Sequence, residues 1–151
     1  MKFQALLVLN DTNAAEVLGR VLDDFQVESE HCSDADSALR RLEDKRFEAV
    51  VVDFDDAGQA NHILQSVRQS STSKSAVAIG LWSDRSNVRS AFGMGANFVL
   101  QKPISTLNAS RCFHAALNFM LKERRRYFRQ PVIIGIPRYA RNFENCYNVA
   151  S

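Results

Sequence analysis

Short apolar runs alternate with amphipathic segments through most of the chain, and this alternation limits the possible folds more than any other feature. Each run is too short for a core helix and suits a buried strand of a parallel sheet. The apolar runs are 3–9, 47–54, 76–82 and 97–100, whereas residues 26–32 alternate and are expected to form a strand nearer an edge, with one wetter face. The segments between them space their apolar residues as a helix does, for example at Leu18, Val21 and Leu22. The sequence therefore predicts alternating strands and helices.

Five strand–helix pairs with short connections predict an α/β fold. Right-handed crossovers then give a doubly wound, five-stranded parallel sheet with helices on both faces. Polar capping residues precede the expected helices, and the last helix should begin at Ser105 or Thr106 and reach about Arg124. A further short helix is expected over 84–95, where Gly93 and Gly95 can end it.

The C-terminal residues break this pattern. Residues 122–151 contain seven lysines and arginines but two acidic residues, and Pro131 and Pro137 interrupt an extended apolar stretch. We therefore expect a domain at 1–121, which is weakly acidic, followed by a basic linker with a short β extension at 122–151.

Composition is that of a globular protein, with 46% hydrophobic and 24% charged residues. No apolar run approaches the roughly 20 residues that a membrane span needs, so we expect no membrane association. The three cysteines are widely spaced, which favours the reducing cytoplasm over a disulfide framework or a cysteine metal site.

Polar side chains follow three of the predicted strands. Asn10 and Asp11 follow the first strand, Asp53 ends the third with Asp55 close behind, and Lys102 follows the fifth. The carboxyl ends of parallel strands meet at one edge of a sheet, where ligands bind. Carboxylate oxygens there could hold Mg²⁺. The metal and the lysine would then screen charge on a phosphoryl group attacked by a carboxylate.

The sequence resembles the receiver domain of two-component response regulators. The resemblance lies in the acidic position after the first strand, the aspartate after the third and the Lys-Pro pair after the fifth. The string "GMGANFVLQKP" is also similar to that family, and the resemblance covers residues 1 to about 121. It implies a flavodoxin-like sheet of order 2-1-3-4-5. It also implies a signalling domain rather than an enzyme, with a sensor histidine kinase or another signalling protein as its partner.

The resemblance also implies roles for individual residues. Asp53 would be the phosphoacceptor, and Lys102 would contact the phosphoryl oxygens. Mg²⁺ would be held by Asp11, by Asp53 and by the backbone carbonyl of Asp55. Simpler roles compete with these: Asp11 could be only a helix N-cap, the Asp55 side chain only part of a solvated loop, and Lys102 only a surface lysine.

The sequence departs from the family at several positions. Asn10 replaces a usual carboxylate, and the family's switch threonine or serine falls at Gly80, which has no hydroxyl. The family's aromatic switch partner falls at Val99. Ser83 could supply the missing hydroxyl only if the alignment slips by three residues. Two functions stay open: a phosphoaccepting receiver that controls a C-terminal output, and a degenerate, phosphorylation-independent receiver that acts as a dimerisation or docking module.

The predicted last helix is apolar around much of its circumference. Its apolar residues are Leu107, Cys112, Phe113, Ala116, Leu117, Phe119, Met120 and Leu121. One stripe should pack on the sheet, and the rest needs a second subunit or the C-terminal tail as cover. The family resemblance implies a homodimer through the fourth helix, the fifth strand and this last helix, with Val88, Phe92 and Phe119 as candidate contacts.

The basic string "ERRRYFRQPV" places Arg125 and Arg129 in an RxxxR spacing. Guanidinium groups suit bidentate phosphate contacts and stacking on purines. The string resembles the opening of a PilZ domain, whose RxxxR motif binds cyclic di-GMP. The family's second motif is incomplete here, because "CYNVAS" lacks its glycine. We therefore expect an incomplete PilZ-type module that binds cyclic di-GMP poorly. A basic helix end that complements the helix dipole is the alternative, and nucleic-acid binding is the least favoured.

Overall fold

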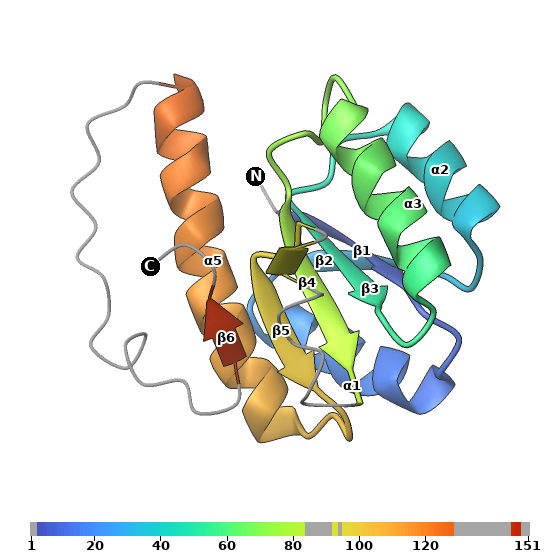
Figure 1. Cartoon of the computed structure of the whole chain (residues 1–151). Coiled ribbons are helices and arrows are strands. Elements are labelled where there is room, and N and C mark those ends of the chain that lie inside the picture. The colour runs from blue at the N-terminus through green and yellow to red at the C-terminus, as the bar shows by residue number, and fades with distance from the viewer. Residues whose placement is uncertain (1–2, 84–91, 94, 129–145, 149–151) are drawn as a thin grey trace.

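The computed structural model describes residues 3–83, 92–93, 95–128 and 146–148. A parallel sheet forms its centre (Figure 1). The parallel strands are β1 (Gln4–Val8), β2 (Glu28–Cys32), β3 (Ala49–Asp53), β4 (Val77–Trp82) and β5 (Phe98–Gln101). They lie in the order β2-β1-β3-β4-β5, which confirms the predicted fold class.

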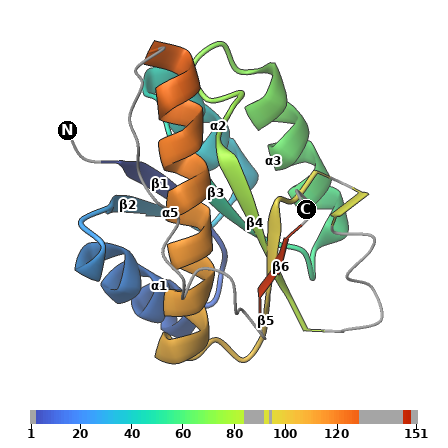
Figure 2. The same ribbon diagram turned by 90° about the vertical axis from the view of Figure 1, so that its left-hand side faces the viewer.

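Helices cover both faces of the sheet (Figures 1 and 2). The described helices are α1 (Thr12–Asp24), α2 (Ala35–Asp44), α3 (Ala57–Gln69) and α5 (Thr106–Phe128). Buried residues of α1 and α5 share one apolar cluster, and those of α2 and α3 share the other. Of the helix expected over 84–95, the structure describes residues 92–93, which are helical, and Gly95, which lies in a turn.

The apolar run at 49–52 lies at the centre of the sheet as β3. Its side chains are at most 1% exposed, because neighbouring strands flank it and helices cover both of its faces. Val51 packs in the cluster under α1 and α5, while Val50 and Val52 pack in the opposite cluster. This alternation follows from the two-residue period of a strand. Asp53 is then the first residue of the run to reach the polar edge.

Aspartates begin three of the helices. The Oδ1 atom of Asp11 accepts the backbone N–H groups of Asn13 and Ala14 at 3.0 and 3.2 Å. Asp34 caps α2 and Asp56 caps α3 in the same way. The short β–α connections predicted from the sequence therefore end in standard helix N-caps.

The C-terminal part extends the sheet. Helix α5 runs to Phe128, past the predicted end near Arg124 and past the predicted domain boundary. Beyond it, β6 (Cys146–Asn148) pairs antiparallel with β5, at a position where the sequence predicted no strand (Figure 2). The extended stretch with Pro131 and Pro137, where the β extension was expected, lies outside the described residues, as do Val88 and Arg129.

Helix α5 packs one stripe on the sheet, as predicted. Ala109, Cys112 and Ala116 are fully buried, and the Phe119 ring meets Phe98 edge-on at 6.1 Å between centroids. Leu107 is 60% exposed. No helix of the described residues combines the length and the apolar character that a bilayer crossing requires.

Candidate functional site

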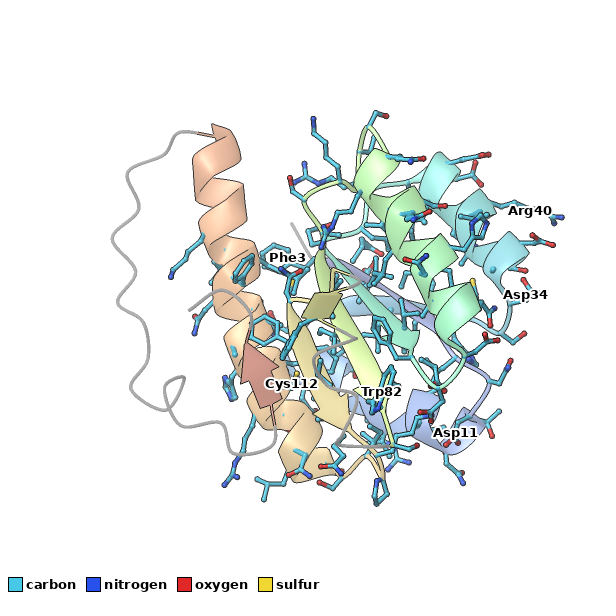
Figure 3. All side chains as sticks on the ribbon, viewed as in Figure 1. Phe3, Asp11, Asp34, Arg40, Trp82 and Cys112 are labelled. Atoms are coloured by element: carbon cyan, nitrogen blue, oxygen red, sulfur yellow. The ribbon has the colours of Figure 1, made fainter. Side chains whose placement is uncertain are left out.

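The carboxyl ends of the strands bring the predicted polar residues to one edge of the sheet. Asp11 follows β1, Asp53 is the last residue of β3, and Lys102 follows β5. Figure 3 shows Asp11 at this edge, where Trp82 ends β4. The peptide bond between Lys102 and Pro103 is cis. The parallel topology thus gathers side chains that are far apart in the sequence.

Lys102 and Asp53 form the central contact of this edge. The Nζ atom of Lys102 donates to Oδ2 of Asp53 at 2.6 Å, and the two side chains are only 19% and 22% exposed. Burial alone would lower the pKa of Lys102, but hydrogen bonds and the negative charges of Asp53 and Asp55 outweigh it and raise that pKa. Lys102 is therefore a largely buried, charged group, which the surface-lysine interpretation did not anticipate.

Asp55 joins the same network through its side chain. Its Oδ2 atom accepts from Lys102 Nζ at 2.9 Å and from the Ser83 hydroxyl at 2.6 Å, while its Oδ1 atom accepts the Ser83 backbone N–H at 3.2 Å. Burial would raise the pKa of Asp55, but the hydrogen bonds from Ser83 and Lys102 outweigh it and lower that pKa. We call Asp53, Asp55, Ser83 and Lys102 the carboxylate–lysine cluster.

This part of the cluster differs from the sequence prediction. The Asp55 side chain was interpreted as loop solvation, and Ser83 was given no role without a shift of the alignment. The structure instead joins the two side chains directly. The position of Ser83 in the sequence could have indicated this contact. Ser83 follows β4 and Asp55 follows β3, and because these two strands pair, the loops after them are neighbours at the carboxyl edge.

Asp53 and Asp11 also make backbone contacts. The Oδ1 atom of Asp53 accepts the N–H of Asp55 at 2.9 Å, which turns the chain directly after β3. Asp11 has the N-cap role that the simpler interpretation gave it. A cavity of about 30 Å³ lies beside Asp53, and Asn10 and Asp56 are among its lining residues.

The groups that the resemblance assigns to Mg²⁺ are carboxylates and a backbone carbonyl. Within the described residues, no three His, Cys, Asp or Glu side chains group as a metal site. The implied set needs only two carboxylates, Asp11 and Asp53, together with the backbone carbonyl of Asp55. Mg²⁺ is usually bound through one or two carboxylates and keeps several waters. The donors implied by the resemblance are all oxygen atoms, the ligand type that Mg²⁺ takes in proteins.

Behind the cluster, an aromatic ring fills the place where a side chain at Gly80 would lie. A Cβ atom built on Gly80 would lie 2.2 and 2.3 Å from Cε2 and Cδ2 of Phe54, far inside contact distance. The Phe54 ring is 1% exposed and lies 5.7 Å from the Trp82 ring. Val99 is the β5 partner of Gly80 in the sheet register. We call Phe54, Gly80 and Trp82 the packed seam.

The predicted cyclic di-GMP residues are not placed. Arg129 lies outside the described residues, and only the backbone of Arg125 is described, within α5. The comparisons with known proteins do not support a PilZ-type module.

No protein-family model matches the chain, and no curated protein matches it by sequence. Solved structures do match. A putative response regulator from Chloroflexus aurantiacus is 23% identical, with a TM-score of 0.69 over 80% of this chain and 99% of that one. A response regulator from Thermotoga maritima is 12% identical, with a TM-score of 0.70 over 78% of this chain and 99% of that one.

A third match is the receiver domain of a sensor histidine kinase from Pseudomonas aeruginosa, described with magnesium in its active site cleft. It is 17% identical, with a TM-score of 0.66 over 80% of this chain and 98% of that one. At these identities the likeness establishes architecture. The chain therefore has the fold of response regulator receiver domains.

Proposed function

We propose that this chain is a cytoplasmic signalling receiver whose Asp53 accepts a phosphoryl group, with a sensor histidine kinase or another signalling protein as its partner. The observation that carries the proposal is the 2.6 Å contact between Lys102 Nζ and Asp53 Oδ2 at the carboxyl edge of the sheet. A buried, protonated lysine beside a strand-end carboxylate is the arrangement that transfer to that carboxylate needs.

The chemistry follows from these two groups. An oxygen of Asp53 attacks the phosphorus of a phosphohistidine, the P–N bond breaks, and the bonding pair returns to the imidazole nitrogen. Lys102 lies where it can donate to a phosphoryl oxygen and offset its charge. Mg²⁺, when bound by Asp11, Asp53 and the carbonyl of Asp55, would supply further charge screening. The Pseudomonas aeruginosa neighbour is described with magnesium in its active site cleft, which supports Mg²⁺ as the metal of this proposal.

A phosphate mimic tests the proposal. Beryllofluoride with Mg²⁺ should shift the amide resonances around Asp53 in the wild-type protein. Asp53→Asn, which removes the attacking carboxylate but keeps the side-chain size, should show no such shift. An unperturbed wild-type spectrum at millimolar beryllofluoride would overturn the proposal.

A phosphorylation-independent docking module is the second candidate, and the packed seam favours it. Gly80 has no hydroxyl to move toward a phosphoryl group, and Phe54 fills the adjacent space. On this proposal the chain binds a signalling protein, or a second copy through β5 and α5, with equal affinity whether or not the mimic is present. Sedimentation velocity over a range of concentrations, with and without beryllofluoride, distinguishes the two candidates.

For the C-terminal segment we keep the prediction that Arg125 and Arg129 do not make a working cyclic di-GMP site. A calorimetric titration with cyclic di-GMP should show no saturable heat, and tight binding would contradict the prediction. The basic residues then have a role at the end of α5, where positive charge complements the helix dipole.

A further inference from the structure

The side chain of Asp55 is held by three donors from two distant parts of the chain. Ser83 contributes its hydroxyl at 2.6 Å and its backbone N–H at 3.2 Å, and Lys102 contributes its ammonium at 2.9 Å. A hydroxyl, a backbone N–H and an ammonium together suit an oxyanion. In this structure the anion bound by the three donors is the carboxylate of Asp55.

One lysine serves two carboxylates in this arrangement. Lys102 donates to Asp53 as well as to Asp55, at 2.6 and 2.9 Å. A phosphoryl group attached to Asp53 brings about 1.5 to 2 further negative charges and three acceptor oxygens. The donors nearest to it are those that Asp55 already uses. Asp55 therefore opposes such a group twice, through like charge and through occupancy of the donors.

We propose that Asp55 is a positioning residue that acts as an internal anion: it occupies the Ser83–Lys102 donor set and weakens the binding of phosphate-like anions beside Asp53. The part that concerns Asp53 rests on the proposed function. The Asp55 side chain is 39% exposed, so it can turn into water without disturbing the core. Lys102 and Ser83 are then free to donate to the oxygens of the incoming group.

The test compares Asp55→Asn with Asp56→Asn. Both remove one negative charge from the same loop, but only Asp55 contacts Lys102, whereas Asp56 caps α3. Asparagine also caps helices well, so the control keeps α3 intact. In calorimetric titrations with beryllofluoride and Mg²⁺, we expect Asp55→Asn to bind at least tenfold more tightly than wild type. Asp56→Asn should change the affinity by less than threefold.

A second titration uses inorganic phosphate, which needs no bond to Asp53. The amide resonance of Ser83 should shift saturably in Asp55→Asn at phosphate concentrations that leave the wild type unchanged. This readout depends on the donor set and not on transfer chemistry. It therefore tests the inference separately from the proposed function.

The outcomes divide as follows. The inference is overturned if wild type and Asp55→Asn bind beryllofluoride with equal affinity, or if Asp56→Asn gains as much affinity as Asp55→Asn. In either case the proposed function still stands if the wild type binds beryllofluoride and this binding depends on Asp53. If neither protein binds beryllofluoride, the proposed function fails and the phosphate titration decides the inference. A Ser83 response confined to Asp55→Asn then supports it, and no response overturns it.

Discussion

The carboxylate–lysine cluster and the packed seam are neighbours at the carboxyl ends of β3 and β4, but one is polar and the other apolar. The cluster is polar, and its contacts are hydrogen bonds and ion pairs that side-chain rotation can exchange. The seam is apolar, and the Phe54 ring leaves no room for a side chain at Gly80. The cluster can change its partners at low cost, whereas the seam can change only by repacking.

This difference separates the groups that would accept a phosphoryl group from the groups that would respond to it by a change of conformation. On the proposed function, the cluster supplies the phosphoaccepting carboxylate of Asp53 and the ammonium of Lys102. The resemblance to receiver domains places a hydroxyl switch in the seam, but the chain has an aromatic ring packed there instead. On the proposed function, Gly80 has no hydroxyl to respond to a phosphoryl group on Asp53, whereas the Ser83 hydroxyl lies within the cluster.

The largest expected effect comes from filling the seam. Gly80→Thr places a Cβ and two further heavy atoms against the Phe54 ring and should destabilise the fold by about 3 kcal/mol or more, the upper part of the range for overpacked cores. Urea unfolding measures this loss. In a double-mutant cycle with Phe54→Ala, the two changes should cost less together than the sum of the single costs. Additive costs would show that the ring is not what excludes a side chain.

Removing the cation of the cluster should have the next largest effect. Lys102→Met keeps most of the apolar stem but leaves Asp53 and Asp55 without their shared partner. We expect beryllofluoride affinity to fall at least tenfold, because no ammonium then offsets the charge of the bound group. Lys102→Arg, which keeps the charge but changes the geometry, is the matched control. Unchanged affinity in Lys102→Met would remove Lys102 from the proposed site.

A smaller effect separates the two roles of Asp11. Asparagine is as good an N-cap as aspartate, so Asp11→Asn should keep the stability within about 0.5 kcal/mol, whereas Asp11→Ala should lose about 1 kcal/mol. If Asp11 also binds Mg²⁺, both variants should weaken Mg²⁺ binding in a metal titration. Wild-type Mg²⁺ affinity in Asp11→Asn would leave Asp11 with the capping role alone.

The smallest expected effect is a change in pH-dependent stability at His114, a residue outside both the cluster and the seam. The His114 ring packs edge-on against Phe25 at 4.5 Å, and burial lowers its pKa from 6.5. The folded state therefore favours the neutral ring. Its contribution to stability is complete above pH 6.5 and is lost as the pH falls from there through the lowered folded pKa. His114→Gln should flatten the dependence of the melting temperature on pH in this window, and an unchanged slope would contradict the assignment.

Local pattern was enough to predict most of the fold. The apolar run before Asp53 predicted the central strand, and the alternation of strands and helices predicted a parallel sheet, whereas the strand order came from the resemblance to receiver domains. The predicted end of α5 was four residues early, because no helix breaker precedes Pro131 and the charged residues at 122–126 continue the helix instead of ending it. Strand β6 has only three residues, and it is defined by its pairing with β5 rather than by a sequence period.

The sequence predicted those site residues whose type and position at a strand end are enough to suggest a role. Asp53 and Lys102 are together, as the parallel topology requires. The partner of the Asp55 side chain could not be predicted, because Lys102 is 47 positions away and its direction depends on the folded loops. The absence of a hydroxyl at Gly80 was visible in the sequence. The ring that occupies the space depends on how β3 and β4 pack.

Trp82 is the chain's single tryptophan, and its position has a practical consequence. It is 7% exposed, lies beside Phe54, and its indole Nε1 has no hydrogen-bond partner among the described residues. Indole emission responds to local polarity and to nearby charge. The intrinsic fluorescence of the unlabelled protein is therefore a one-site probe located directly behind the carboxyl edge, and it can follow events there in real time.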